Sequence, residues 1–313
     1  MTLFEALDFS LAAIVLGLAA RTISARRVFG AVVAYVAYGL LLAIVWVRLY
    51  APDVALTEAA IGSGVTGVLL ISASTRLGPL PAPDAPPGAA LKAGAAALSA
   101  LVAGIVAAAV LYLPDPAPSL APEADAHLAE TGLGNAVTAV LIAYRSFDTM
   151  LEKVVLVLAV AGVWSVAPDR FWGGAPAPLG PAAPDAALVF LARVIAPIGA
   201  VIGVQMFWVG ADEPGGAFQG GAILAAMWMI VMMARLTEPP RISSGWLRLA
   251  LIAGPGVFLL AGLAGPVMAG SFFAFPPGFT KPVILFIEAF MVLSIAVTLP
   301  LLVAGPPNRE ARR

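Results

Sequence analysis

The sequence contains no cysteine, one histidine and few charged residues. Among its 313 residues are no Cys, the single His127, and 11% charged residues, 17 basic against 18 acidic. The absence of cysteine excludes disulfides, thiolate iron–sulfur ligation and cysteine nucleophiles, and one histidine disfavours a histidine metal site or a haem. A net charge of −1 lacks the basic surface that nucleic-acid binding needs. We therefore expect no cofactor, no metal and no nucleic-acid partner.

Apolar residues dominate instead. They make up 61% of the chain, and the mean hydropathy is +0.99, whereas a soluble domain carries roughly a quarter charged residues. The apolar runs have about the 20 residues that cross a bilayer, without the period-two alternation of a membrane β-barrel. Backbone groups in hydrocarbon must be bonded within their own segment, so the sequence predicts an all-α integral membrane protein in a lipid bilayer.

Nine membrane-spanning helices are predicted. Placing the turn 21–27 in the cytoplasm puts thirteen basic residues inside and only Arg48 and Lys281 outside, which predicts the N-terminus out and the C-terminus in. No basic segment precedes the first run, so we expect a retained helix rather than a cleaved signal. The predicted spans are 7–23, 28–50, 54–72, 91–113, 148–167, 186–209, 215–236, 247–269 and 282–303.

The spans are expected to form two bundles, of five and four helices. About 33 residues after position 134 lack a turn signal, too many for one straight span, which predicts a re-entrant or interfacial helix near 135–147. No extramembrane stretch is long enough for an enzyme site of its own, and no internal repeat indicates a solitary transporter. The predicted segments are 1–80 with three helices, 81–167 with two, a Pro/Gly/Ala linker at 168–185, and 186–313 with four.

Ionisable residues inside the spans are the candidate ion path, because each costs about 2.5–3.5 kcal/mol at membrane depth unless partnered or hydrated. Arg145, Asp148 and Glu152 fall on one predicted helical face, together with Thr149, and Lys153 flanks that face. Two interpretations stay open. The group is either a stretch of a proton or cation relay, or a self-neutralised set that joins two helices.

Three further acids lie in or beside predicted spans. Glu58 stands on a face otherwise made of small residues, and is either a relay acid or an acid held protonated by burial. Asp53 is predicted to cap the helix that follows Pro52. Glu288 lies seven residues after Lys281, about 10 Å along the helix, which is too far for direct pairing. We expect Glu288 to be a relay acid or to pair with a neighbour in an assembly.

A glycine-rich turn connects the sixth and seventh spans. Its sequence over 212–221 is Asp-Glu-Pro-Gly-Gly-Ala-Phe-Gln-Gly-Gly, in which the glycines permit positive φ and close helix contact. Asp212 and Glu213 form a weak candidate for a cation mouth, and a rigid turn is the alternative. The turn lacks the ending and the preceding strand of a phosphate loop.

Three segments carry a resemblance to known families. Residues 51–59, Ala-Pro-Asp-Val-Ala-Leu-Thr-Glu-Ala, resemble the D-type subunit of membrane-bound hydrogenases, a signature shared by the C-terminal region of the Mrp antiporter A subunit. Residues 135–152 are similar to the E-type segment that follows it in those families. Residues 191–221, with Pro-Gly-Gly-x-Phe-x-Gly-Gly, resemble the Mrp antiporter B subunit, MnhB. The order D, E, B covers nearly the whole chain.

This resemblance implies a non-catalytic membrane subunit of an Mrp-type cation/proton antiporter-like complex in the cell membrane of a prokaryote. The implied partners are large A- and D-type proton-channel subunits and small C-, F- and G-type subunits, and the transported ions are H⁺ and in some members Na⁺. The resemblance implies a role in the ion path for the positions that match family motifs, which are Asp53, Glu58, Arg145, Asp148 and Glu152.

The sequence departs from the family in ways that weaken a plain Na⁺/H⁺ antiporter assignment and leave room for a proton-only or redox-linked complex. Lys153 stands where the family has an apolar residue, and Asp212-Glu213 stands where the B-type turn has His-Asn. Two alternatives remain: the membrane subunit of a hydrogenase-like or complex I-like oxidoreductase whose redox centres lie in other chains, and an assembly scaffold without a transport role.

Overall fold

A computed structural model describes residues 2–77 and 88–309 of the chain. It is a set of long helices with one very short two-stranded sheet, so the predicted all-α membrane fold is confirmed. The predicted segment boundary at 80/81 lies outside the described residues. The direction in which the chain crosses the membrane stays a prediction.

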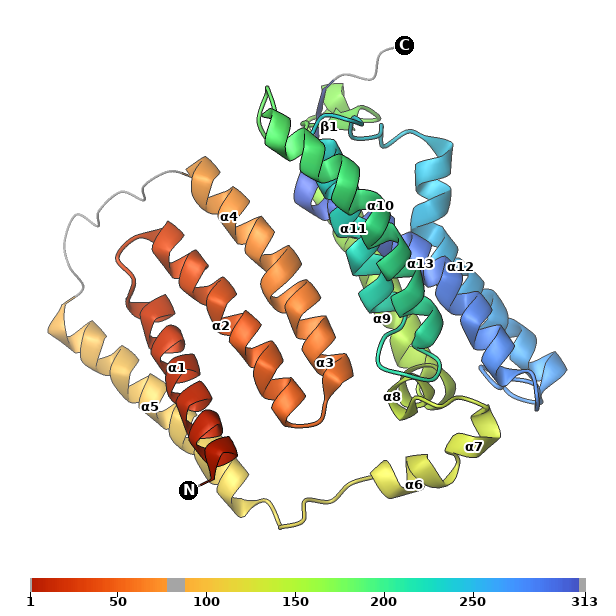
Figure 1. Cartoon of the computed structure of the whole chain (residues 1–313), viewed down its shortest axis with the longest axis horizontal. Coiled ribbons are helices and arrows are strands. Elements are labelled where there is room, and N and C mark those ends of the chain that lie inside the picture. Colours follow the sequence, from red (N-terminus) through yellow and green to blue (C-terminus); the bar gives the residue numbers. More distant parts are fainter. Residues whose placement is uncertain (1, 78–87, 310–313) are drawn as a thin grey trace.

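The first part of the chain is a layer of antiparallel helices (Figure 1). A capping box begins α1, because the Thr2 hydroxyl accepts from the Glu5 amide while the Glu5 carboxylate accepts from the Thr2 amide. The third span begins at Pro52, in the first position of its helix, and contains a π-helical stretch, η1. The elements are α1 (Leu3–Ser24), α2 (Val28–Arg48), α3 (Pro52–Thr57), η1 (Glu58–Val65), α4 (Thr66–Leu77) and α5 (Ala89–Tyr112).

The middle of the chain is broken into short helices before one long one. Arg145, with φ −124° and ψ 38°, interrupts the helical backbone between η2 and α9. A short helical stretch at 136–144 is therefore separate from the long helix, and its placement at the bilayer stays a prediction. The elements are α6 (Ala121–Ala126), α7 (Leu128–Thr131), α8 (Ala136–Thr138), η2 (Ala139–Tyr144) and α9 (Ser146–Ser165).

The last part is a bundle built around α13, the most buried of the long helices. α11 packs between α10 and α13, and α12 packs on α13. A two-residue strand in the linker pairs antiparallel with the end of the chain. The elements are η3 (Asp169–Phe171), β1 (Ala175–Pro176), α10 (Ala186–Val209), α11 (Ala217–Met233), α12 (Gly245–Met268), α13 (Thr280–Ala304) and β2 (Pro307–Arg309).

A helix lies at each of the nine predicted positions, but they differ in apolar length. Seven helices of the described chain are long and apolar enough to cross a membrane, and α11, with 17 residues, is a shorter apolar helix. α9 is not among the seven, and it carries Asp148, Glu152 and Lys153.

The position of α9 differs from the predicted grouping of five and four helices. This helix precedes the linker in sequence, yet it packs against α12 and α13. Val160 and Trp164 of α9 belong to one buried cluster with Leu247 of α12 and Leu301 of α13. By contact, the fifth span therefore belongs with the last four, because its apolar face is buried there.

Candidate functional site

A cavity of about 460 Å³ lies where the three parts of the chain meet. Its wall is formed by α3 and η1, by α8 and η2, by α9, by the glycine-rich turn with the start of α11, and by α13. Many of its lining residues are apolar, so the polar ones stand out: Asp53, Thr57, Thr138, Thr149, Glu152, Lys153, Gln219 and Glu288. Four sequence-predicted ion-path residues, Asp53, Glu152, Lys153 and Glu288, lie together in this cavity.

Lys153 places a cation in the wall of the cavity. Its side chain is only 3% exposed, and its Nζ lies 2.7 Å from Glu152 Oε1. The same nitrogen lies 4.3 Å from the centre of the Phe218 ring, close enough for a cation–π contact. Glu152 itself is 48% exposed. The pair is formally neutral, with its positive end buried and its negative end at the edge of the protein.

Glu288 brings a carboxyl group to the same cavity from α13, and is 2% exposed. Its Oε1 accepts a hydrogen bond of 3.2 Å from the amide of Ala217, the first residue of α11. The start of a helix is electropositive, so this contact favours a negative charge on Glu288. Its Oε2 is buried without a hydrogen-bond partner among the described residues. This carboxyl group is half satisfied, which leaves one oxygen available for a proton or a moving donor.

Asp53 joins all three parts of the chain, and it is not a helix cap as predicted. The N-cap of α3 is Ala51, and the Asp53 side chain is buried beside the glycine-rich turn. Its Oδ1 accepts from the Gly215 amide at 2.9 Å and from Asn135 Nδ2 at 3.5 Å. The carboxyl group therefore holds the turn and the middle segment against α3.

Gln219 adds a second link between α11 and α3. Its Nε2 donates to Thr57 Oγ1 at 3.2 Å and to the Asp53 carbonyl at 3.4 Å. Gln219 and Asn135 lie inside recognisable motifs, but neither is a sequence-predicted site residue. Asn135 caps α8 locally through the Val137 amide, whereas the contacts that bring the two side chains to the site span 78 to 166 positions and have no local signal.

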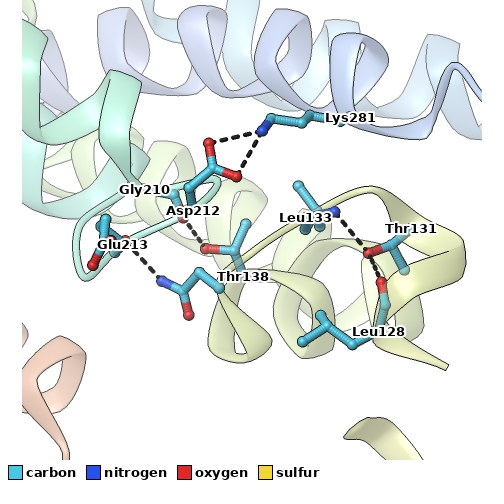
Figure 2. A network of polar contacts seen from close by, with 9 residues as sticks. Leu128, Thr131, Leu133, Thr138, Gly210, Asp212, Glu213 and Lys281 are labelled. Atoms are coloured by element: carbon cyan, nitrogen blue, oxygen red, sulfur yellow. Dashed lines mark hydrogen bonds and ion pairs between the residues drawn. The ribbon is translucent and has the colours of Figure 1, made fainter. Parts of the chain in front are cut away.

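The glycine-rich turn is fixed from two sides (Figure 2). Thr138 Oγ1 donates to the Gly210 carbonyl at 2.6 Å, and the Asn135 side chain donates to the Glu213 carbonyl at 3.0 Å. Lys281 Nζ lies 2.6 and 2.7 Å from the two carboxylate oxygens of Asp212. Because Lys281 already neutralises Asp212, this geometry favours the rigid-turn interpretation over a cation mouth made with Glu213.

Arg145 and Asp148 lie away from the cavity. They are paired with each other, with Arg145 Nε 2.7 Å from Asp148 Oδ2, and their side chains are 68% and 54% exposed. Both line a second cavity of about 420 Å³ with Phe272 and Phe273. The helix breaks at Arg145, which separates this residue from the predicted common face. Of the three other members, all on α9, Thr149 and Glu152 line the central cavity and Asp148 does not.

Glu58 occupies a third place, between α2 and η1. It is half-buried and folds over Gly62, and its Oε1 lies 3.2 Å from the position that a Cβ on Gly39 would take. The small-residue face predicted around Glu58 is therefore used for close packing. Glu58 is not among the residues that line the central cavity.

Two family models match separate parts of the chain. Residues 13–79 match MbhD, the D-type subunit of MBH. Residues 187–305 match MnhB, a domain related to the MnhB subunit of the Na⁺/H⁺ antiporter. The predicted order of a D-type region followed by a B-type region is confirmed. Neither matched range includes the middle segment, whose E-type character stays a prediction.

Two solved structures share the fold. A chain of the Mrp complex from Dietzia sp. DQ12-45-1b aligns with a TM-score of 0.74 and 22% identity, over 97% of this chain and 35% of that one. This chain thus spans about a third of that relative. A chain of the membrane-bound sulfane sulfur reductase, an archaeal respiratory membrane complex, aligns with a TM-score of 0.57 and 24% identity, over 68% of this chain and 97% of that one. No curated protein matches.

Proposed function

We propose that this chain, which joins an MbhD-like region to an MnhB-related region, is a membrane subunit of an Mrp-type cation/proton antiporter-like complex and carries part of the proton path. The observation that supports this most strongly is the central cavity, where buried Lys153 and buried Glu288 meet at the junction of the three segments. Burying either charge costs several kcal/mol unless it is paired or hydrated, and ionisable residues kept at membrane depth commonly mark ion pathways. The partners would be large antiporter-like subunits and small C-, F- and G-type subunits.

The chemistry would be proton transfer between carboxyl groups under the influence of a buried cation. Glu152 is half-exposed and already contacts Lys153, so it would exchange protons with the neighbouring subunit or with water. Glu288 has one buried oxygen without a partner among the described residues, so it would hold the proton on the inner side. A change of charge on either acid acts strongly on Lys153, because the cavity wall is mostly apolar.

The contacts support H⁺ rather than Na⁺ as the ion in this cavity. A buried ammonium group repels a second cation, and Lys153 occupies the wall. Two of the acidic oxygens that a Na⁺ ion would use, on Asp53 and Glu288, already accept backbone N–H groups. A proton needs only one free oxygen, which Glu288 provides.

A redox-linked complex is the second candidate. The observation that favours it is the likeness to a chain of an archaeal respiratory membrane complex, which this chain matches over 97% of that chain's length. Co-purification of the native complex decides between the two. An associated iron–sulfur or nickel–iron subunit would support the redox candidate, and its absence from an intact complex would support the antiporter.

The test of the transport role is ΔpH-dye transport in inverted vesicles that contain the complete complex. Glu152→Gln and Glu288→Gln are compared with wild type and with Glu123→Gln, an exposed acid on α6. We expect transport to be lost in the first two variants and kept in the third, with assembly checked on a native gel and Na⁺ present or absent. Unchanged transport in both cavity variants would rule out the proton-path role and support an assembly scaffold. Asp148→Asn tests the second cavity in the same assay.

A further inference from the structure

The turn between α1 and α2 concentrates positive charge at the end of two membrane helices. Arg21, Arg26 and Arg27 line a cavity of about 580 Å³ there, together with Ser24, Phe29 and Gly30. No acid lines this cavity, and among the described residues no carboxylate forms an ion pair with any of the three arginines. All three arginines are exposed and no carboxylate of the described chain neutralises them, so this hollow carries a positive charge that favours an anion.

The start of α2 adds hydrogen-bond donors to these arginines. α2 begins at Val28, its N-cap Arg27 makes no side-chain capping bond, and its first turn contains no acid. The first amides of a helix have no partner within the helix and carry a partial positive charge. The cavity reaches Gly30, whose missing side chain leaves this end of the helix open.

We infer that this turn binds the phosphodiester group of an anionic membrane lipid. Guanidinium groups match phosphate oxygens with paired hydrogen bonds, and a phosphodiester carries the single negative charge that such a cluster can neutralise. This inference concerns a surface remote from the central cavity and does not rest on the proposed transport role.

The surroundings of the cavity point to a lipid rather than to a soluble phosphate. The turn connects two helices that are long and apolar enough to cross a membrane, so it lies at headgroup depth. Ile23 is 88% exposed and Phe29 is 55% exposed, one on each side of the arginines. These side chains would contact the acyl chains of a lipid whose phosphate lies in the cavity. The predicted orientation would put the turn at the cytoplasmic leaflet, whose surface is negative.

Equilibrium binding of radiolabelled short-chain phosphatidylglycerol to the purified complex, in an uncharged detergent, tests the inference. Arg26→Gln/Arg27→Gln is compared with Lys92→Gln/Arg193→Gln, which removes two exposed basic residues from separate helices. We expect the first pair to weaken the tightest site by about fivefold for each arginine removed, and the second pair to leave it unchanged. Equal affinity in all three proteins would overturn the inference.

Two further experiments distinguish a lipid site from a site for soluble phosphate, and a loss of binding from a loss of folding. Inorganic phosphate and glycerol phosphate at millimolar concentration should fail to displace the lipid, and displacement would show a site for soluble phosphate instead. Arg26→Lys/Arg27→Lys keeps the charge but loses the paired hydrogen bonds, so it should bind the lipid more tightly than the glutamine pair and less tightly than wild type, in a complex that runs intact on a native gel. Binding as weak as that of the glutamine pair would contradict an electrostatic site.

Discussion

The ammonium group of Lys153 lies 2.7 Å from the Glu152 carboxylate, although the two side chains differ greatly in exposure, 3% against 48%. The lysine is therefore held inside by an acid that reaches the surface of the chain. Phe218 covers the ammonium from α11, so the contact also joins the middle segment to the MnhB-related region. An ion pair arranged in this way connects a buried charge with a face that a neighbouring subunit or water can reach.

Glu152→Gln should abolish transport and destabilise the protein. The substitution leaves the Lys153 cation buried with a neutral partner, which costs roughly 3–5 kcal/mol when a fully buried pair is broken and less here because Glu152 is half-exposed. The measurements are ΔpH-dye transport in inverted vesicles and the melting temperature of the purified complex.

The control for this prediction removes both charges. Glu152→Gln/Lys153→Met leaves no unpaired ion, so the melting temperature should recover while transport stays lost. Recovery of both would mean that the pair is structural. If the double variant is less stable than Glu152→Gln alone, another contact of Lys153 contributes more to stability than its pair with Glu152.

Gly220→Ala should separate α10 from α11 and lower stability. A Cβ at Gly220 would lie 2.6 Å from the Gly203 carbonyl oxygen, and this oxygen belongs to backbone that cannot move aside cheaply. Overpacking of this kind costs typically 1–3 kcal/mol.

Gly256→Ala is the matched control, because no atom lies within 4 Å of its Cβ position. The helix propensity of alanine should make that variant equal to wild type or up to about 1 kcal/mol more stable. Equal melting temperatures of the two variants would contradict the close contact.

His127 should titrate above its ordinary pKa, and its signal is unambiguous because the chain has a single histidine. A hydrogen bond from the ring to Glu130, at 3.1 Å, is the main cause that raises the pKa of His127, and Glu123 contributes less. A raised pKa means that this contribution to stability is present at low pH and is lost as the pH rises through the pKa of the folded protein.

The measurement is an NMR titration of the protein with ¹³C-labelled histidine. Glu130→Gln should return the midpoint most of the way toward the ordinary value of about 6.5, and Glu123→Gln should move it less. The opposite order would show that Glu123 is the main partner in solution.

The sequence predicts the helices of this protein well because their physical cause is local. Three signals can be read from the sequence without knowing any tertiary contact: the apolar runs, the proline that begins the third span, and the glycine-rich turn. The π-helical stretch at η1 has no such signal, because Gly62 and Gly64 within it lower helix propensity without distinguishing a π-helix from an α-helix. Glu58, its first residue, packs beside Gly39 of α2.

Much of the candidate site depends on contacts between distant segments, which periodicity does not report. Lys153 was expected to flank a polar face, and it is instead the most enclosed charge on α9. The spacing of Lys281 and Glu288 correctly excluded a direct pair, but it could not reveal that the first binds Asp212 and the second accepts from the start of α11. Arg145 shows the opposite failure, because a backbone break moved it off the face that spacing predicted.

Exchanging the charges of Asp212 and Lys281 should separate the rigid-turn interpretation from a cation mouth. Asp212→Lys places two cations where a pair of 2.6 Å now exists, which should loosen the turn from α13 and lower the melting temperature. Adding Lys281→Asp restores the pair with reversed polarity, so stability should return to within about 1 kcal/mol of wild type, the range for exposed pairs. If Asp212 acts only by positioning the turn, the double variant would then support transport normally. A cation mouth would stay impaired, because the acid would have moved to α13 and a lysine would stand in the turn. Transport that recovers together with stability in the double variant would therefore establish that Asp212 positions the turn, and persistent loss with full stability would establish that it meets the ion.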